Sequence, residues 1–138
     1  MIDFIKLVDN ILKEQGKTKK ALFENKIVSE NTFFKYRQRY PSLRTAIKIA
    51  NFLQVSLDYL FEFSNENHFK IYKKEELKFY ENLISFIKNK KISARQFCKD
   101  MGYSKDNINR WKNGISPTIP RLLEIGKYFA CTIDDLLL

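Results

Sequence analysis

The 138-residue chain is poor in residues that interrupt or cross-link regular structure, with only four glycines, three prolines, two cysteines and one histidine. So few glycines and prolines indicate long regular elements with few sharp turns. Valine is also scarce, whereas leucine, isoleucine, phenylalanine and lysine are common, and this balance favours helix over sheet. The composition therefore predicts an all-α fold.

The rare residues that carry chemistry do not form a recognisable site. Cys98 and Cys131 lack a Cys-x-x-Cys motif and a nearby histidine, so we interpret them as reduced core thiols. His68 alone is too little for a histidine-based metal site or catalytic triad. Asp134-Asp135 is typical of the acidic start of a short helix. We expect no catalytic residues, no metal, no cofactor and no enzymatic activity.

Long apolar runs are also missing. The longest uncharged stretch, residues 49–57, is far too short to span a membrane. Residues 1–6 contain an acid and a base and lack the apolar core of a signal peptide. These features predict a cytoplasmic protein with no membrane partner.

Charge of one sign is in excess, with 25 basic and 16 acidic residues and a net charge of +9. This excess is typical of proteins whose partner is a polyanion, either nucleic acid or an anionic membrane surface. A lysine-rich surface that maintains solubility is the alternative, and charge alone leaves the choice open.

The sequence repeats itself once, with a period of 75 to 76 residues. The aligned pairs include Leu12 with Ile87, Thr18 with Ser93, Leu22 with Phe97, Ser29 with Ser104, and Tyr36 with Trp111. One extra residue near Gly114 shifts the register, after which Pro41 aligns with Pro117. We therefore predict two copies of one fold, in residues 1–63 and 74–138, joined by a polar linker at residues 64–73.

Each copy is predicted to contain five short helices, because apolar residues recur at helical spacing between Ser or Thr caps. The expected caps are Thr18, Ser29, Ser42 and Ser56 in the first copy, and Ser93, Ser104, Thr118 and Thr132 in the second. Gly16 is expected to end the first helix, and Gly102 to provide a left-handed turn between the second and third helices of the second copy. Tyr36 and Trp111 continue the apolar faces of the third helices and are expected in the core.

The segment from Ser93 to Gly114, with Gly102 at its turn and Pro117 before the next helix, resembles the core of the Cro/CI-type repressor domains, also called the XRE family. The resemblance covers residues 79–138 well and residues 4–62 more loosely. It implies two tandem five-helix, lambda-repressor-like helix-turn-helix domains. It also implies that double-stranded DNA is the partner, with the third helix of a domain in the major groove.

By this resemblance, the third helix of the second copy presents the DNA-reading residues Lys105, Asp106, Asn107, Asn109 and Arg110. Arg110 suits a bidentate contact to guanine, and Asn109 or Asn107 suits adenine. Phosphates would be held by Ser93, Thr118 and the loop Lys112-Asn113-Gly114.

The first copy departs from the pattern. Ile27 replaces the turn glycine, so its turn must be built differently or carry strain. Phe23 stands in place of the smaller Cys98, and Phe34 is expected to be exposed. The corresponding DNA-binding positions are Asn31, Thr32, Lys35, Arg37 and Arg39. Either both copies bind DNA, which is the interpretation we prefer, or the first has become a dimerisation or partner-binding domain.

The sequence thus predicts a sequence-specific DNA-binding protein, a transcriptional repressor or related regulator of prokaryotic or phage type. It would act as a homodimer, or as an intramolecular pseudo-dimer in which one chain contains two DNA-binding domains. The alternative is a protein-interaction module, such as an antitoxin or adaptor. Ile27, Phe34 and the C-terminal Leu137-Leu138 favour that alternative, because exposed apolar residues mark interfaces.

Overall fold

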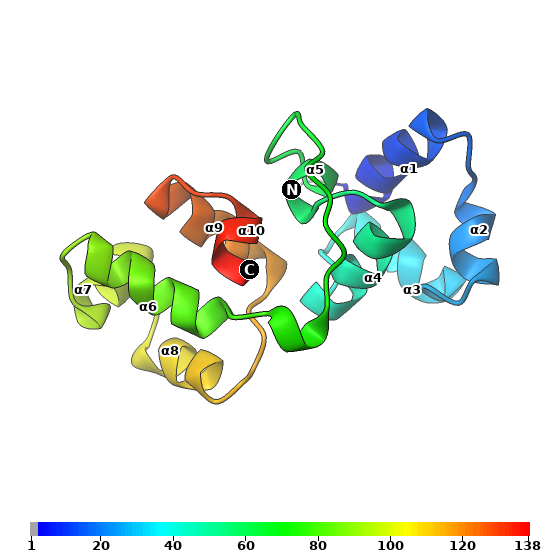
Figure 1. The fold of residues 1–138 in the computed structure, drawn as a ribbon. Coiled ribbons are helices and arrows are strands. Elements are labelled where there is room, and N and C mark those ends of the chain that lie inside the picture. Colours follow the sequence, from blue (N-terminus) through cyan, green and yellow to red (C-terminus); the bar gives the residue numbers. More distant parts are fainter. Residues whose placement is uncertain (1–2) are drawn as a thin grey trace. The chain divides into compact units, whose positions relative to one another are not determined.

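The computed structural model describes residues 3–138, and this part of the chain contains ten α-helices, two short 3₁₀ helices and no strand. The all-α prediction is confirmed. The chain divides between Tyr72 and Lys73 into two compact units (Figure 1). None of the described helices is both long and apolar enough to cross a membrane.

The first unit is built around α1, whose buried residues recur at helical spacing. Its elements are α1 (Phe4–Glu14), α2 (Lys19–Glu24), α3 (Glu30–Phe34), η1 (Lys35–Arg37), α4 (Leu43–Leu53) and α5 (Leu57–Leu60). α1 packs against η1 and α5. Phe4 and Phe33 are fully buried, and both rings make edge contacts with the buried Tyr36. Tyr36 therefore lies in the core as predicted, although it belongs to a 3₁₀ turn and not to the third α-helix.

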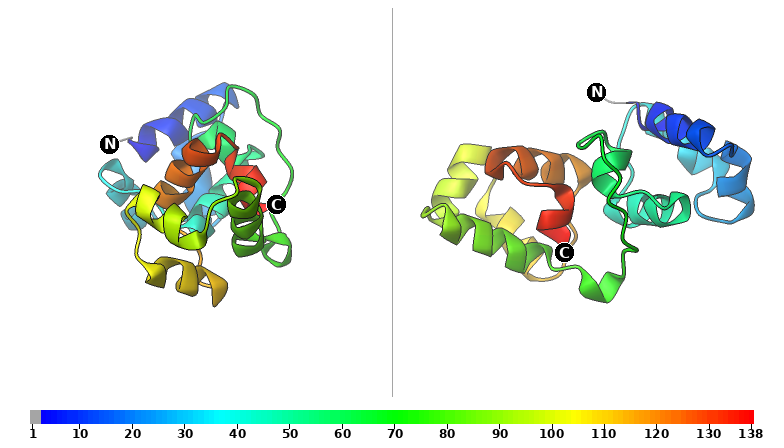
Figure 2. Two further views of the ribbon diagram at one scale, coloured as in Figure 1. Left: turned by 90° about the vertical axis from the view of Figure 1, so that its left-hand side faces the viewer. Right: turned by 45° about the horizontal axis from the view of Figure 1, so that its top comes forward.

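The second unit has the same order of helices (Figure 2). Its elements are η2 (Lys74–Glu76), α6 (Phe79–Asn89), α7 (Ala94–Met101), α8 (Lys105–Lys112), α9 (Ile119–Phe129) and α10 (Ile133–Leu137). α6 contacts α7, α8 and α10. Leu83, Phe97 and Leu122 are fully buried. The Lys78 N–H donates to the Leu137 carbonyl oxygen (2.8 Å), which ties the start of α6 to the end of the chain.

All the predicted Ser and Thr caps precede a helix. Ser29, Ser42, Ser56, Ser93, Thr118 and Thr132 each accept a hydrogen bond from a backbone N–H in the first turn. Thr18 and Ser104 occupy the cap position of α2 and α8 without such a bond. At α10 the Asp135 carboxylate also accepts from the Thr132 N–H, completing a capping box. The acidic start predicted for this helix is confirmed.

The turns between helices two and three are built differently in the two units. In the second unit Gly102 takes a left-handed backbone (φ 72°), as predicted. In the first unit the left-handed residue is Lys26 (φ 56°), one position before Ile27. The N–H groups of Ile27 and Tyr103 close equivalent bonds, to Leu22 O (3.0 Å) and Cys98 O (2.8 Å). In the repeat register, the first unit thus ends its second helix two residues earlier and has its left-handed residue one position earlier. There a side chain adopts a conformation that favours glycine.

The end of the segment predicted as a linker is attached to the first unit. The Asn67 side chain accepts from the Ser56 N–H (2.9 Å) and donates to the Gln54 carbonyl oxygen (3.0 Å). The Tyr72 hydroxyl accepts from the Leu57 N–H (2.8 Å), and the Tyr72 backbone pairs with both ends of the Asn51 amide. These contacts satisfy N–H groups that the start of α5 would otherwise leave unbonded. Residues 73–77 are then the only stretch between Tyr72 and the anchored Lys78.

Candidate functional site

The helix α8 is anchored on its inner face and polar on its outer face. The Trp111 ring is buried and makes edge contacts with Phe79 (5.2 Å) and Tyr103 (6.1 Å). The exposed residues of α8 include Lys105, Asp106, Asn109 and Arg110, which we call the reading surface. The predicted separation of an apolar face from a polar one is confirmed for these residues.

The cations of this helix are exposed to solvent. Within residues 3–138, Lys105, Arg110 and Lys112 form no ion pair. Asp106 is the acidic residue of the first helical turn. Asn107 differs from its neighbours, because it is half-buried and its amide oxygen accepts from the Ser104 hydroxyl (3.3 Å). Of the two asparagines predicted to pair with adenine, Asn109 is therefore the exposed one.

The residues predicted to hold phosphates lie at the starts of α7 and α9 and in the loop after α8. The Ser93 hydroxyl accepts from the Gln96 N–H (3.0 Å) and the Thr118 hydroxyl from the Arg121 N–H (3.4 Å). At α7 the first two residues, Ala94 and Arg95, are exposed. N–H groups at a helix start have no partner within the helix, so they are suited to bind an anion. At α9 the second residue is Pro120, which has no N–H to offer.

The loop Lys112-Asn113-Gly114 is exposed, and Gly114 adopts φ 93°. A positive φ of this size is accessible to glycine without a steric penalty. The next residue, Ile115, is 56% exposed, so an apolar side chain stands beside the predicted phosphate contacts.

Tyr103 connects the turn between α7 and α8 to α9. Its hydroxyl donates to the Glu124 carboxylate (2.5 Å), and the Arg121 guanidinium lies 4.3 Å from its ring centroid. Arg121 also bonds Glu124 (3.2 Å). Burial, followed by the bond to Glu124, raises the pKa of Tyr103 well above its ordinary value, so it remains a neutral donor.

A second set of hydrogen bonds stabilises the end of α7. The Asp100 carboxylate accepts from the Tyr128 hydroxyl (2.7 Å) and from the Gln96 amide (2.7 Å). These bonds lower the pKa of Asp100. The bonds Tyr103–Glu124 and Tyr128–Asp100 were not predicted from the sequence, because their partners are 21 and 28 residues apart along the chain.

A hollow of about 210 Å³ opens between α7 and α8. It is lined by Ala94, Arg95, Cys98, Lys105, Ile108 and Asn109, and we call it the α7–α8 hollow. Cys98 is 6% exposed, and burial raises the pKa of its thiol, as expected for an inert core cysteine. Cys131 is half-buried, so the core prediction is less complete for that residue. The sequence signal for the hollow was the small size of Cys98 compared with Phe23 in the first copy.

In the first unit the corresponding surface is filled by aromatic rings. Phe23, Phe33 and Phe34 contact one another at centroid distances of 5.8 to 6.3 Å, and Phe34 is 39% exposed. The predicted residues Asn31, Lys35, Arg37 and Arg39 are exposed. Thr32 is half-buried, and its hydroxyl accepts from the Ser29 hydroxyl (2.8 Å). The α-helix here ends at Phe34, so Lys35 and Arg37 lie on η1.

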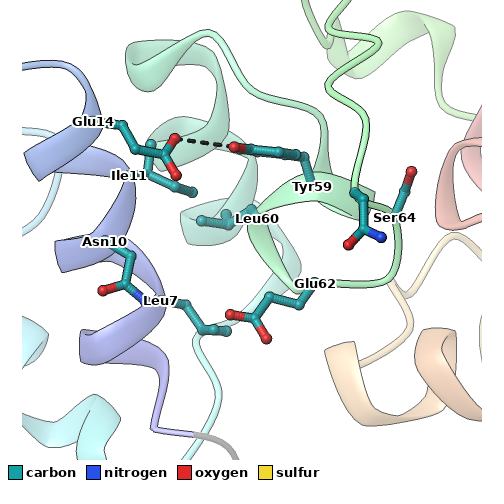
Figure 3. Close-up of a pocket in the computed structure, with 9 residues that line it drawn as sticks. Leu7, Asn10, Ile11, Glu14, Tyr59, Leu60, Glu62 and Ser64 are labelled. Carbon is teal, nitrogen blue, oxygen red and sulfur yellow. Dashed lines mark hydrogen bonds between the residues drawn. The ribbon is translucent and has the colours of Figure 1, made fainter.

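The first unit also has a hollow of about 310 Å³ between α1, α5 and the chain that follows (Figure 3). Glu14 and Glu62 line it, above an apolar floor that includes Leu60. The Tyr59 hydroxyl donates to Glu14 (3.0 Å), and this bond raises the pKa of Tyr59. Two carboxylates make this hollow unsuited to a phosphate, so it is not part of a nucleic-acid surface. Within residues 3–138 no group of three or more His, Cys, Asp or Glu side chains could hold a metal ion.

The family model of the Cro/C1-type HTH DNA-binding domain matches residues 82–137. Residues 82–137 are therefore a Cro/C1-type helix-turn-helix domain, a DNA-binding regulatory fold that is generally non-enzymatic. The match lies in the second unit, and a second copy of this domain in the first unit stays a prediction. No curated protein and no solved structure matches the chain.

Proposed function

We propose that the chain binds specific sequences of double-stranded DNA and represses transcription by occupying its operator. One observation carries this proposal. The Cro/C1-type domain holds α8 by the buried Trp111, and the cations of α8 form no ion pair with any residue that the structure describes. A helix with a fixed inner face and unpaired polar residues outside suits the major groove.

The exposed side chains of α8 can form hydrogen bonds that distinguish one base from another. The Arg110 guanidinium can donate two parallel bonds to O6 and N7 of guanine, and the Asn109 amide can pair with N6 and N7 of adenine. Lys112 and the first N–H groups of α7 contribute phosphate contacts, which orient the domain without reading sequence. We propose that the chain acts as a homodimer or as a pseudo-dimer in which Asn31, Lys35, Arg37 and Arg39 also meet DNA.

The test is selection from random-sequence duplexes at graded salt concentrations. If each unit neutralises three or four phosphates, log affinity falls against log salt with a slope of roughly −5 to −7. A slope about half as steep indicates that the second unit binds alone. The proposal fails if no sequence is enriched and the slope is close to zero.

A second candidate function applies to the first unit. Phe34 is 39% exposed at the position that matches the reading surface, and the Lys19 ammonium lies 5.8 Å from its ring centroid. An exposed aromatic residue flanked by cations suits a protein partner better than a phosphate-lined groove. A partner that copurifies in a 1:1 ratio and is lost on Phe34→Ser, while DNA binding persists, supports this role.

A further inference from the structure

We infer that the α7–α8 hollow is a pocket for the C5-methyl group of a thymine in the major groove, an inference that rests on the proposed DNA-binding function. The hollow lies beside the reading surface, because Lys105 and Asn109 belong to both. A group entering the hollow would therefore come from the DNA that α8 reads.

The floor of the hollow is apolar and its rim is cationic. Cys98 is buried and Ile108 is half-buried at the floor, and the exposed Ala94 adds a methyl group at the rim. Arg95 and Lys105 are exposed at the rim and form no ion pair within residues 3–138. In the major groove, the thymine methyl is the apolar group that base pairs present. The thymine methyl would contact the apolar floor of the hollow, and the nearby phosphates would attract the cations at its rim.

The repeat within the chain provides an internal comparison. In the sequence register, Cys98, Ile108 and Asn109 correspond to Phe23, Phe33 and Phe34. Those three rings contact one another in the first unit. Large aromatic side chains therefore stand in the first unit at the positions where the second unit has the smaller side chains of Cys98, Ile108 and Asn109, which line the hollow. We expect the two units to differ in the apolar groups that they can accept from DNA.

The experiment replaces a thymidine of the DNA by deoxyuridine, which removes the methyl group and leaves base pairing unchanged. After selection of a binding site, each thymine is replaced in turn and the Kd of the full chain is measured by fluorescence anisotropy. We expect a loss of about fourfold at one position of the site read by the second unit, the value for burial of one methyl group. Replacements elsewhere are expected to change Kd by less than about twofold.

The variant Cys98→Met fills the hollow from below, and Cys131→Met is the matched control, because Cys131 does not line the hollow. The uracil-to-thymine ratio of Kd values is expected to fall to about one in Cys98→Met and to stay near four in Cys131→Met. If Cys98→Met does not fold, Ala94→Leu fills the hollow from its exposed rim and gives the same readout.

The outcomes separate the two proposals. Absence of DNA binding at low salt overturns the proposed function and the methyl pocket together. Sequence-specific binding with no methyl-sensitive position, or with an unchanged ratio in both filling variants, overturns the pocket alone. Cytosine against 5-methylcytosine is the parallel comparison. A gain on cytosine methylation without a loss at any thymine overturns the thymine assignment and identifies methylated DNA as the ligand.

Discussion

Arg110 and Lys112 both lie in the last turn of α8, but we expect them to contact different parts of the DNA. Arg110 belongs to the reading surface, whereas Lys112 is at the last position of α8, before the exposed loop. A guanidinium that pairs with a base edge contributes to specificity, and an ammonium that meets a phosphate contributes to affinity for any sequence. The two residues therefore form a matched pair of test positions.

We predict that Arg110→Ala weakens binding to the selected site by about 1–3 kcal/mol and relaxes the preference at one base position. Lys112→Ala is predicted to weaken binding to all sequences alike and to reduce the salt slope by about one. Both are measured by anisotropy titrations on the selected site and its single-base variants. An Arg110→Ala protein that keeps its full base preference contradicts the reading role of Arg110.

Single residues were predictable where their partners lie nearby in the sequence. The caps at Ser29 and Ser93 were predicted because a cap bonds a backbone group three residues away. Asn107 was predicted from the sequence to be a DNA-reading residue, although its amide oxygen accepts a hydrogen bond from Ser104. The bonds of Tyr72 to Leu57 and of Tyr103 to Glu124 depend on packing between helices, which periodicity does not specify.

At the scale of elements, the turn of the first unit contains a non-glycine residue in the left-handed region. Lys26 has φ 56°, and a side chain there costs about 1–2 kcal/mol. The sequence showed that the turn glycine was missing but not which residue replaces it, because the left-handed residue lies one position earlier in the repeat register than Gly102. The third helix was also predicted as a single α-helix, whereas it changes to a 3₁₀ turn at Lys35.

We predict that Lys26→Gly stabilises the first unit by about 0.5–1 kcal/mol, because glycine removes the steric cost but increases the freedom of the unfolded chain. Ile27→Gly is the matched control and is predicted to destabilise, since Ile27 does not have a positive φ. Gly102→Ala is predicted to cost about 1 kcal/mol in the second unit. Apart from Gly102 and its two neighbours in the chain, no described residue has an atom within 4 Å of the added methyl, so that cost is conformational.

Urea unfolding distinguishes these effects, because Trp111 is the single tryptophan and reports on the second unit, while circular dichroism reports on both. Lys26→Gly should move the dichroism transition and leave the tryptophan transition in place. If Ile27→Gly stabilises the chain as much as Lys26→Gly does, the left-handed position has been assigned to the wrong residue.

At the scale of the whole molecule, the composition was sufficient to predict an all-α fold, and the repeat and the cap spacing were sufficient to predict the observed order of helices. They were not sufficient to predict what the connecting segment does. Its polar composition indicated a linker, yet Asn67 and Tyr72 complete the hydrogen bonds at the start of α5. The role of a connecting segment depends on contacts with the surface it crosses, and composition contains no information about them.

Because residues 67–72 are attached to the first unit, only a short stretch of chain connects the two units. From Tyr72 to Lys78 the chain can span at most about 20 Å, so once one unit is bound, a second site within reach meets a high local concentration of the other unit. We predict that tandem sites bind tightly at only a narrow range of spacings. Insertion of six Gly-Ser residues after Lys73 should broaden that range and lower the peak affinity, as measured on duplexes with graded spacers. An insertion without effect on either quantity would mean that the units do not bind DNA together, and that the short tether serves folding alone.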